Sequence, residues 1–370
     1  MMRITLLSLG TLGDVALMAT LGQRLASRGA QVTLAASPFY ASHAEEAGLG
    51  FERVGSGGFE QMRDALAAAM ANALPAQRTE AFFKAWVLPQ LTEGDAGLTR
   101  LVEASDYFVS NLKIVRNVGS RATPTARVTY DPPHSLDDLN RFGPVRPEVI
   151  DLVALPRELI DPEGRCEPRF EFTGFWLPEE QTDAEVAQEL ERFVAAGEDD
   201  ILAVTLGSMP VGDPQDFTSV ASRAARDAGL RCVLVGAWSG VESGAGENGD
   251  LLIVPHAPYD WLFARSRCVV HHGSTGATSI AIRTGTPSVV VPFLSCQHDM
   301  GSLLCAAGLA SGVVPGAFDD PDSLAEAVAM AATDQGLREN AGEWSLRMNR
   351  ERGADQAAQR VFEHHEQLFG

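Results

Sequence analysis

The sequence predicts an α/β protein made of two doubly wound, Rossmann-like domains that face each other across a cleft. The chain has 370 residues, which is longer than a typical single domain. Short apolar strands alternate with helical segments from the N-terminus onward, and a second such series starts near Phe170. This alternation is typical of parallel sheets with right-handed crossover connections, so the two series predict two sheets.

The first series predicts the N-terminal sheet. Three apolar runs, RITLLSL, QVTLAA and FERV, are expected strands, separated by helices over Val15–Arg28 and Pro38–Ala47. Two more strands, DYFVSN and ARVTYD, flank a short expected helix near Ile114–Arg121. The segment Pro132–Pro168 is rich in Pro, Asp and Arg and only weakly periodic, so we expect loops there that lead to an interdomain linker.

The second series predicts the C-terminal sheet. Its expected strands are ILAVTL, RCVLVG, LLIVP, RCVVHH and PSVVVPF, and its helices cover Asp216–Ala228, Tyr259–Ala264 and Gly276–Thr284. A polar helical tail follows from Pro321. We therefore expect domains at residues 1–170 and 171–355, and a last helix at 356–370 that packs back on the first domain.

The composition argues against several classes of partner. The formal net charge of −20 would repel nucleic acid and anionic membranes, so an anionic ligand must be held by local dipoles and donors. The five cysteines form no C-x-x-C pair and lie mostly in apolar runs, which favours reduced thiols in a cytoplasmic protein. No apolar stretch reaches about 18 residues and no cleavage site follows the first strand, so neither a membrane span nor a signal peptide is expected.

A strand-to-helix turn carries the main candidate site. In HHGSTGATS, which starts at His271, a buried strand ends and a helix begins. The outward N–H groups of this turn and the helix dipole would form a site for a phosphate or diphosphate, with these turn residues: Gly273, Ser274, Thr275 and Gly276. His271 could add one more donor. The alternative is a turn that merely needs glycine, beside a structural histidine.

Two other phosphate motifs do not apply. No GK[ST] follows the turn, so it is not a Walker A loop. The stretch GAGENG (Gly244–Gly249) matches G-x-G-x-x-G, but it runs into the strand LLIVP instead of opening a helix. A flexible loop is therefore expected at GAGENG.

Four stretches of the chain occur in the order of a known family. They are SLGTLGDV (Ser8–Val15), FTGFW (Phe172–Trp176), VTLGSMPVGDP (Val204–Pro214) and the long segment Pro255–Gly312, which begins PHAPYDWLF. In this order, they resemble four motifs of the UDP-glycosyltransferase superfamily: its N-terminal GTRGDV turn, its interdomain TGYW segment, its GFGSMP strand-loop and its donor-sugar signature. This superfamily has the GT-B fold. The resemblance is nearest to bacterial and fungal enzymes that act on sterols, rhamnolipids and antibiotic aglycones.

The resemblance implies that the C-terminal half binds a nucleotide-diphosphosugar and the N-terminal half binds an acceptor. The donor diphosphate would lie on His271 and the turn residues, with Ser208 approaching from a neighbouring turn. The nucleobase would lie beside Pro255, His256 and Trp261, with Trp238 as a further neighbour. No cofactor and no metal is implied, because helix N-termini and side-chain donors stabilise the leaving group in this fold.

Asp14 is the candidate catalytic residue. It follows the first strand in a turn at the start of the first helix. Taken from position alone, an aspartate there favours a helix N-cap. Family members place a histidine or aspartate at this position as general base for the acceptor hydroxyl, so the resemblance implies this role for Asp14. Such a base supports an inverting displacement and contributes roughly 10²–10⁴-fold.

Two departures from the family pattern affect this reading. The usual Asp-Gln pair that contacts sugar hydroxyls is here Cys296-Gln297, and a cysteine cannot accept a charge-assisted hydrogen bond worth roughly 1.5–3 kcal/mol. We therefore expect a deoxy or otherwise modified sugar. The N-terminal half is also short. Asn111 stands where some relatives have an aspartate that orients the base, and His134 is a further candidate for the acceptor side.

The sequence thus predicts an inverting, metal-independent glycosyltransferase of the hexosyltransferase type. Its partners would be a nucleotide sugar and a small hydrophobic acceptor such as a natural-product aglycone, as in antibiotic biosynthesis, or a lipid. The alternatives are a catalytically inactive homologue that binds donor or partner proteins and, less favoured, a sugar-nucleotide epimerase. The sequence does not decide between UDP and dTDP donors. It also leaves open the identity of the sugar and of the acceptor, the linkage atom and whether the protein forms a homodimer.

Overall fold

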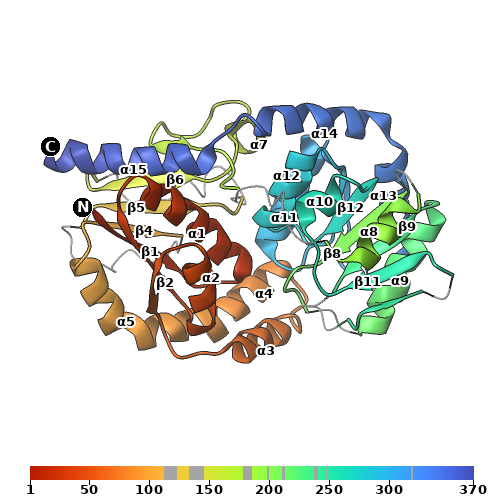
Figure 1. Ribbon diagram of the computed structural model, residues 1–370, viewed down its shortest axis with the longest axis horizontal. Helices are drawn as coiled ribbons and strands as arrows, with labels where there is room; N and C mark the ends of the chain where they lie inside the picture. The colour runs from red at the N-terminus through yellow and green to blue at the C-terminus, as the bar shows by residue number, and fades with distance from the viewer. Residues whose placement is uncertain are drawn as a thin grey trace. The chain divides into compact units, whose positions relative to one another are not determined.

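The structure, a computed structural model, describes residues 1–111, 123–132, 146–177, 186–197, 200–210, 213–236, 241–246, 248–317 and 320–370. It contains two compact α/β units, coloured along the chain in Figure 1. The first unit comprises Met1–Ala68, Glu80–Pro178 and Glu351–Gly370. The second comprises Ala69–Thr79 and Glu179–Arg350.

The first unit is built on a seven-stranded sheet whose order is β3-β2-β1-β4-β5-β6-β7. All neighbouring strands in this order run parallel. The strands are β1 (Arg3–Ser8), β2 (Gln31–Ala36), β3 (Gly50–Arg53), β4 (Tyr107–Ser110), β5 (Thr125–Thr129), β6 (Val149–Val153) and β7 (Phe170–Phe172). The expected N-terminal sheet is therefore confirmed.

Helices α1 and α15 pack together against one face of this sheet. The buried residues of α1 recur at helical spacing (Val15, Met18, Leu21 and Leu25) and form one core with Ile4 and Leu6 of β1. The helices along this part of the chain are α1 (Leu12–Ser27), η1 (Pro38–Tyr40), α2 (Ala41–Glu46), α3 (Phe59–Ala69), α4 (Pro75–Phe82), η2 (Phe83–Val87), α5 (Leu88–Glu103), α7 (Arg157–Ile160) and α15 (Gly353–Phe369).

The second unit has its own seven-stranded sheet, ordered β10-β11-β9-β8-β12-β13-β14. The strands are β8 (Ile201–Thr205), β9 (Arg231–Val235), β10 (Gly244–Ala245), β11 (Leu251–Val254), β12 (Cys268–His271), β13 (Ser288–Val290) and β14 (Ala310–Val313). All run parallel except β10, which pairs antiparallel with β11 at the sheet edge. The helices are α8 (Gln188–Ala195), α9 (Pro214–Asp227), α10 (Tyr259–Phe263), α11 (Thr275–Thr284), α12 (Ser295–Ala306), α13 (Pro321–Thr333) and α14 (Gln335–Met348).

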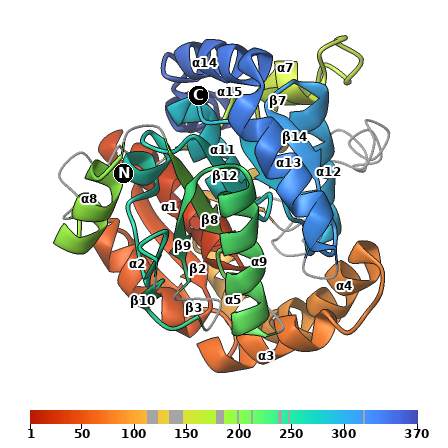
Figure 2. The same ribbon diagram turned by 90° about the vertical axis from the view of Figure 1, so that its right-hand side faces the viewer.

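The period-2 geometry of a strand divides the core of the second unit into two layers. Ile201 and Ala203 of β8 join one buried cluster with α8, α10 and α11. The alternate residues Leu202 and Val204 line a small apolar cavity with residues of α9 and α13 on the other face. Figure 2 shows α9 and α13, which pack against each other, over this sheet. Both faces are covered, which is why β8 reads as a continuous apolar run.

Strand order places two topological switch points in the molecule. In the first sheet β1 and β4 are neighbours, but the next strand after β1 is added on one side of this pair and the next strand after β4 on the other. The neighbours β8 and β12 have the same arrangement in the second sheet. Ligands in doubly wound sheets bind at such points, beyond the carboxyl ends of the strands. We therefore expect ligands to bind at the segments that follow β1 and β4 and at those that follow β8 and β12.

Three expectations from the sequence need correction or lie outside the described residues. The segment Pro132–Pro168 is not only loop, because it contains β6, which pairs with β5 over five residues, and the short helix α7. The stretch GAGENG is not only a flexible loop, because Gly244–Ala245 form β10. The helix near Ile114–Arg121 falls outside the described residues. None of the described helices combines the length and apolar character needed to cross a bilayer.

Candidate functional site

The turn between β12 and α11 forms the donor-side candidate at the second switch point. Ser274 is the N-cap of α11, and its Oγ accepts a hydrogen bond from the Ala277 N–H at 3.3 Å. Thr275 and Gly276 are the first two residues of the helix, so their N–H groups have no acceptor within the helix. Gly276 is exposed, whereas Thr275 is buried. The turn therefore presents helix N–H groups and the positive end of the helix dipole together.

Gly273 is required by the geometry of this turn. Its φ of +83° lies in the left-handed region, which favours glycine. A Cβ at this position would lie 2.7 Å from the Gln297 carbonyl oxygen and 2.9 Å from Val290 Cγ1. The backbone must pass this close to α12 for the turn to form, and no larger residue fits without displacement.

His271 is fully buried and neutral, with one imidazole nitrogen engaged and the other not. Burial, and next the neighbouring His272, lowers the pKa of His271 to about 3. Its Nδ1 accepts a hydrogen bond from the Gly273 N–H at 3.1 Å, which places the ring proton on Nε2. Among the described residues, Nε2 has no hydrogen-bond partner. His271 therefore holds a buried N–H donor that none of the described residues accepts.

His272 connects this turn to the loop after β8. His272 is buried, which lowers its pKa to about 4, while a hydrogen bond to the Thr205 backbone opposes that shift. Gly207 has a φ of +56°, and a Cβ there would lie 2.7 Å from His272 Cε1. The ring thus packs directly on the backbone that precedes half-buried Ser208. This contact could not be predicted from the sequence, because it depends on the register of β8 and β12.

Asp14 lies after β1, at the first switch point. It is the third residue of α1, where its Oδ2 accepts hydrogen bonds from the Thr11 N–H at 2.5 Å and the Thr11 hydroxyl at 3.1 Å. The N-cap itself is Thr11. Asp14 Oδ1 accepts a hydrogen bond from the Tyr130 hydroxyl, which follows β5. Burial raises the pKa of Asp14, while the bonds from Tyr130 and Thr11 lower it.

Asn111 does not contact Asp14 directly but acts on Tyr130. Its Nδ2 donates to the Tyr130 hydroxyl and to Ser8 Oγ, both at 3.0 Å. The carboxylate, phenol, amide and hydroxyl therefore form one network over the ends of β1, β4 and β5. Tyr130 is the residue in this network that sequence reasoning missed. His134 lies outside the described residues.

Comparison with known proteins agrees with this fold. No family model matches the chain. An O-mycaminosyltylonolide 6-deoxyallosyltransferase of Streptomyces fradiae is 28% identical over 419 aligned positions, which cover 96% of each chain. The solved structure of CalG4, the calicheamicin glycosyltransferase, superposes with a TM-score of 0.70 at 18% identity, covering 100% of this chain and 99% of the other. The glycosyltransferase VinC in complex with dTDP gives a TM-score of 0.66 at 15% identity, covering 99% and 100%.

The chain has the GT-B fold, and its similarity to the Streptomyces fradiae enzyme over 96% of both chains identifies it as a glycosyltransferase. The enzyme class expected from the sequence motifs is therefore confirmed. Within the described ranges, no group of three or more His, Cys, Asp or Glu side chains is arranged to hold a metal ion. The remaining described candidate residues of this glycosyltransferase lie at the start of α12 and on or just before α10.

The start of α12 carries the Cys296-Gln297 pair of the glycosyltransferase. Its N-cap is Leu294, which has no polar side chain to cap the helix. Gln297 supplies part of this function, because its Oε1 accepts hydrogen bonds from the Phe293 N–H at 2.8 Å and the Leu294 N–H at 3.0 Å. Its Nε2 lies 3.4 Å from Met209 Sδ. The Gln297 amide is thus engaged within the protein, whereas Cys296 is half-buried one residue earlier.

The residues expected on the nucleobase side lie just before α10 or on it. Pro255 and His256 are exposed, and Trp261 is half-buried with the Arg265 guanidinium 4.5 Å from its ring centroid. The Tyr259 hydroxyl lies 2.7 Å from Thr205 Oγ1, which joins α10 to the end of β8. Trp238 lies outside the described residues.

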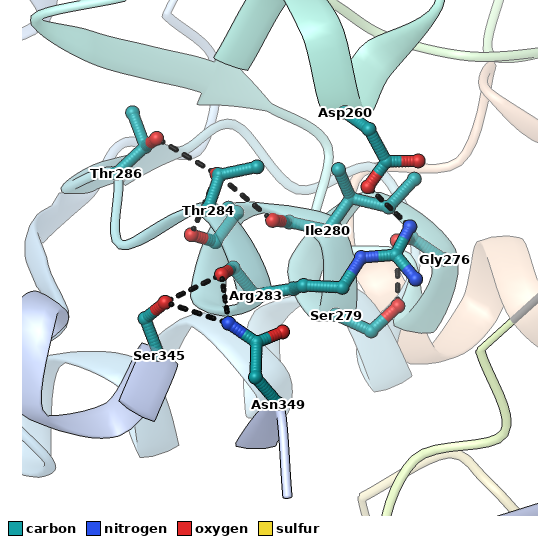
Figure 3. Close-up of polar contacts among 10 residues, drawn as sticks. Asp260, Gly276, Ser279, Ile280, Arg283, Thr284, Thr286, Ser345 and Asn349 are labelled. Atoms are coloured by element: carbon teal, nitrogen blue, oxygen red, sulfur yellow. Dashed lines mark hydrogen bonds and ion pairs between the residues drawn. The ribbon is translucent and has the colours of Figure 1, made fainter. Parts of the chain in front are cut away.

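A polar cluster fixes α10 and α14 to α11 of the glycosyltransferase (Figure 3). Arg283 on α11 reaches Asp260 on α10 in an ion pair, with the Arg283 side chain only 6% exposed. The Arg283 carbonyl accepts hydrogen bonds from the Ser345 hydroxyl of α14 at 2.5 Å and from Nδ2 of Asn349, the C-cap residue of α14, at 3.4 Å. The helix that begins at the candidate anion site is therefore anchored at its other end, and Asp260 adjoins Trp261 in sequence.

Gly273→Ala is expected to destabilise the glycosyltransferase and to weaken its binding of dTDP. The strained φ alone costs about 1–3 kcal/mol, and the methyl group would push α12 from the turn. Gly342→Ala is the matched control, because Gly342 lies on α14, outside the proposed diphosphate site, and a Cβ there meets nothing within 4 Å. Urea unfolding and calorimetric titration with dTDP measure both variants. Equal behaviour of the two variants would contradict this account of the turn.

Proposed function

We propose that this glycosyltransferase moves a deoxy or otherwise modified sugar from a UDP- or dTDP-sugar to a small hydrophobic natural-product acceptor, with inversion and without metal. The observation that carries this proposal is the buried, neutral His271, whose Nε2–H has no partner among the described residues and which precedes the N-terminus of α11. In a protein with a net charge of −20, such a set of local donors is what an anionic diphosphate needs.

In the proposed reaction, Asp14 takes the proton from the acceptor hydroxyl as that oxygen attacks the anomeric carbon of the donor sugar. The bond from the anomeric carbon to the diphosphate oxygen breaks, and the electron pair leaves with the nucleoside diphosphate. His271 and the N–H groups at the start of α11 stabilise the charge that develops on the leaving group. Because the pKa of His271 is about 3, its imidazole acts near neutral pH as a hydrogen-bond donor and not as a cation.

Two findings support the proposed donor and acceptor classes. VinC, which shares the fold, was solved with dTDP, and the Streptomyces fradiae relative transfers a 6-deoxyallosyl group to O-mycaminosyltylonolide. A 6-deoxy sugar has one hydroxyl fewer to satisfy. This agrees with Cys296 in the position where the family usually has a carboxylate, and with a Gln297 amide that already bonds the protein backbone.

A donor panel tests the proposal. The protein is incubated with a hydrophobic aglycone library and, separately, UDP-glucose, dTDP-glucose and a dTDP-6-deoxyhexose, and products are measured by mass spectrometry. We expect the deoxy donor to give the highest kcat/KM. Cys296→Asp should shift the preference toward glucose donors by about 10–150-fold, which corresponds to one charge-assisted bond of about 1.5–3 kcal/mol. UDP-glucose as the best donor of the unmodified protein would refute the proposed sugar class.

A further inference from the structure

Tyr130 stands between two groups that fix the direction of its hydroxyl proton. Asn111 Nδ2 donates to the phenol oxygen at 3.0 Å, so the phenol proton is directed to another acceptor. That acceptor is Asp14 Oδ1. The second donor hydrogen of the Asn111 amide is bound by Ser8 Oγ at 3.0 Å, which holds the amide in place. The three strands that carry these residues, β1, β4 and β5, are neighbours in the sheet.

The network holds both oxygens of the Asp14 carboxylate. Thr11 occupies Oδ2 and Tyr130 occupies Oδ1, so the plane of the carboxylate is set by two elements of the fold. An ionised carboxylate offers about four lone-pair positions, two on each oxygen. Oδ2 already accepts two hydrogen bonds from Thr11, whereas Oδ1 accepts one from Tyr130 and can still accept a further proton or hydrogen bond. The carboxylate is thus oriented without being saturated.

In the part of the chain that the structure describes, the groups that act on the pKa of Asp14 are neutral. Among the described residues, its pKa responds to burial, Tyr130 and Thr11, with no contribution from a charged side chain. The other titratable group beside it is the Tyr40 phenol, which donates to the Gly10 carbonyl at 3.2 Å and not to the carboxylate. Burial and the Asp14 charge raise the pKa of Tyr40, so this phenol also stays protonated. A neutral donor favours ionised Asp14 while lowering its basicity less than an adjacent cation would.

We propose that Tyr130 is the positioning residue of Asp14, holding the carboxylate ionised and in one orientation through a relay from Asn111 and Ser8. The inference rests on the proposed role of Asp14 as general base. In this proposal the Tyr130 phenol, which follows β5, orients the base, and Asn111 acts on catalysis indirectly, through Tyr130. Tyr130 and Asn111 act through Asp14 and need not touch the sugar or the acceptor.

Tyr130→Phe tests the relay by removing a single hydroxyl. The titration of Asp14 is followed directly by NMR of ¹³C-labelled aspartate carboxyls, with Asp14→Asn to assign the signal. We expect the midpoint to move upward in Tyr130→Phe, because the lost bond favoured the ionised form. The acid limb of the pH profile of sugar transfer should move upward by the same amount, with the donor KM unchanged. Transfer should largely recover above the new midpoint.

Tyr40→Phe is the matched control, because it removes a neighbouring phenol that does not donate to Asp14. It should not raise the Asp14 midpoint. If Tyr130→Phe does not fold, Asn111→Leu repeats the test with the phenol in place, and a smaller upward shift is expected.

An Asp14 midpoint that stays at its original value in the folded Tyr130 or Asn111 variant overturns the proposal. A midpoint that shifts while Asp14→Asn still transfers sugar upholds the relay and overturns only the catalytic role of Asp14. The failure of the inference and the failure of the proposed function are therefore distinguishable.

Discussion

Asp14→Asn is expected to lower the rate of sugar transfer by about 10²–10⁴-fold, the contribution of a positioned general base. Asparagine has nearly the same shape as aspartate but cannot take a proton from the acceptor hydroxyl. Its amide oxygen can still accept a hydrogen bond from the N–H of Thr11, the N-cap residue of α1. This contact at the helix N-terminus is therefore retained. The Tyr130 hydroxyl meets the amide nitrogen or must turn away, which adds a small loss of stability.

The decisive measurement pairs transfer with donor binding. Asp14 lies in the first unit, and the residues proposed to bind the diphosphate lie in the second, so the affinity for dTDP should be unchanged in a calorimetric titration. Asp64→Asn, an exposed aspartate on α3, serves as the control and should transfer at the original rate. Transfer by Asp14→Asn within tenfold of the original protein would refute the base. If the unmodified protein binds dTDP but transfers no sugar from any donor, the inactive-homologue alternative is favoured.

The position of Asp14 could be predicted from sequence because it depends on local order. A strand, a short turn and a helix follow one another within a few residues, and the aspartate lies at the helix start. The same applies to the turn from His271 to Gly276, where an apolar strand is followed by glycine and then by a helix. Such features require no knowledge of how distant segments pack.

The partners of these residues could not be predicted, because they depend on tertiary contacts. Tyr130 reaches Asp14 only because β5 lies next to β4 and β4 next to β1 in the sheet. Gln297 was expected to contact sugar, but its amide oxygen bonds the backbone before α12, where Leu294 leaves the helix without a side-chain cap. Strand β6 was missed because it is short and lies in a segment rich in Pro, Asp and Arg. Its strand conformation is stabilised by pairing with β5 and not by local sequence propensity.

Removal of Asp260 is the second change for which we expect a large effect. Arg283 is 6% exposed and Asp260 25% exposed, so the pair lies largely out of water (Figure 3). Breaking a buried ion pair from one side costs about 3–5 kcal/mol, because the remaining buried charge loses its ion-pair partner. We expect Asp260→Ala to cost about 3 kcal/mol, the low end of that range, since Asp260 itself is partly hydrated.

The two halves of this ion pair should not be equivalent. Arg283→Met leaves a carboxylate that water can reach, whereas Asp260→Ala leaves a guanidinium that water reaches poorly, so Asp260→Ala should be the more damaging. Arg226→Ala is the control, because Arg226 is 52% exposed and lies 3.4 Å from Asp250, a surface pair worth about 0.2–1 kcal/mol. Urea unfolding of the full chain ranks the three variants.

Asp260→Ala should also weaken dTDP binding, whereas Arg226→Ala should not. Asp260 holds α10 against α11, and α10 carries Trp261 on the proposed nucleobase side while α11 begins at the proposed diphosphate site. Loss of the ion pair allows α10 to move relative to α11. The base and the diphosphate of the nucleotide then no longer meet a single preorganised surface. If Asp260→Ala unfolds like Arg226→Ala and binds dTDP with unchanged affinity, the ion pair has neither the structural nor the binding role assigned to it.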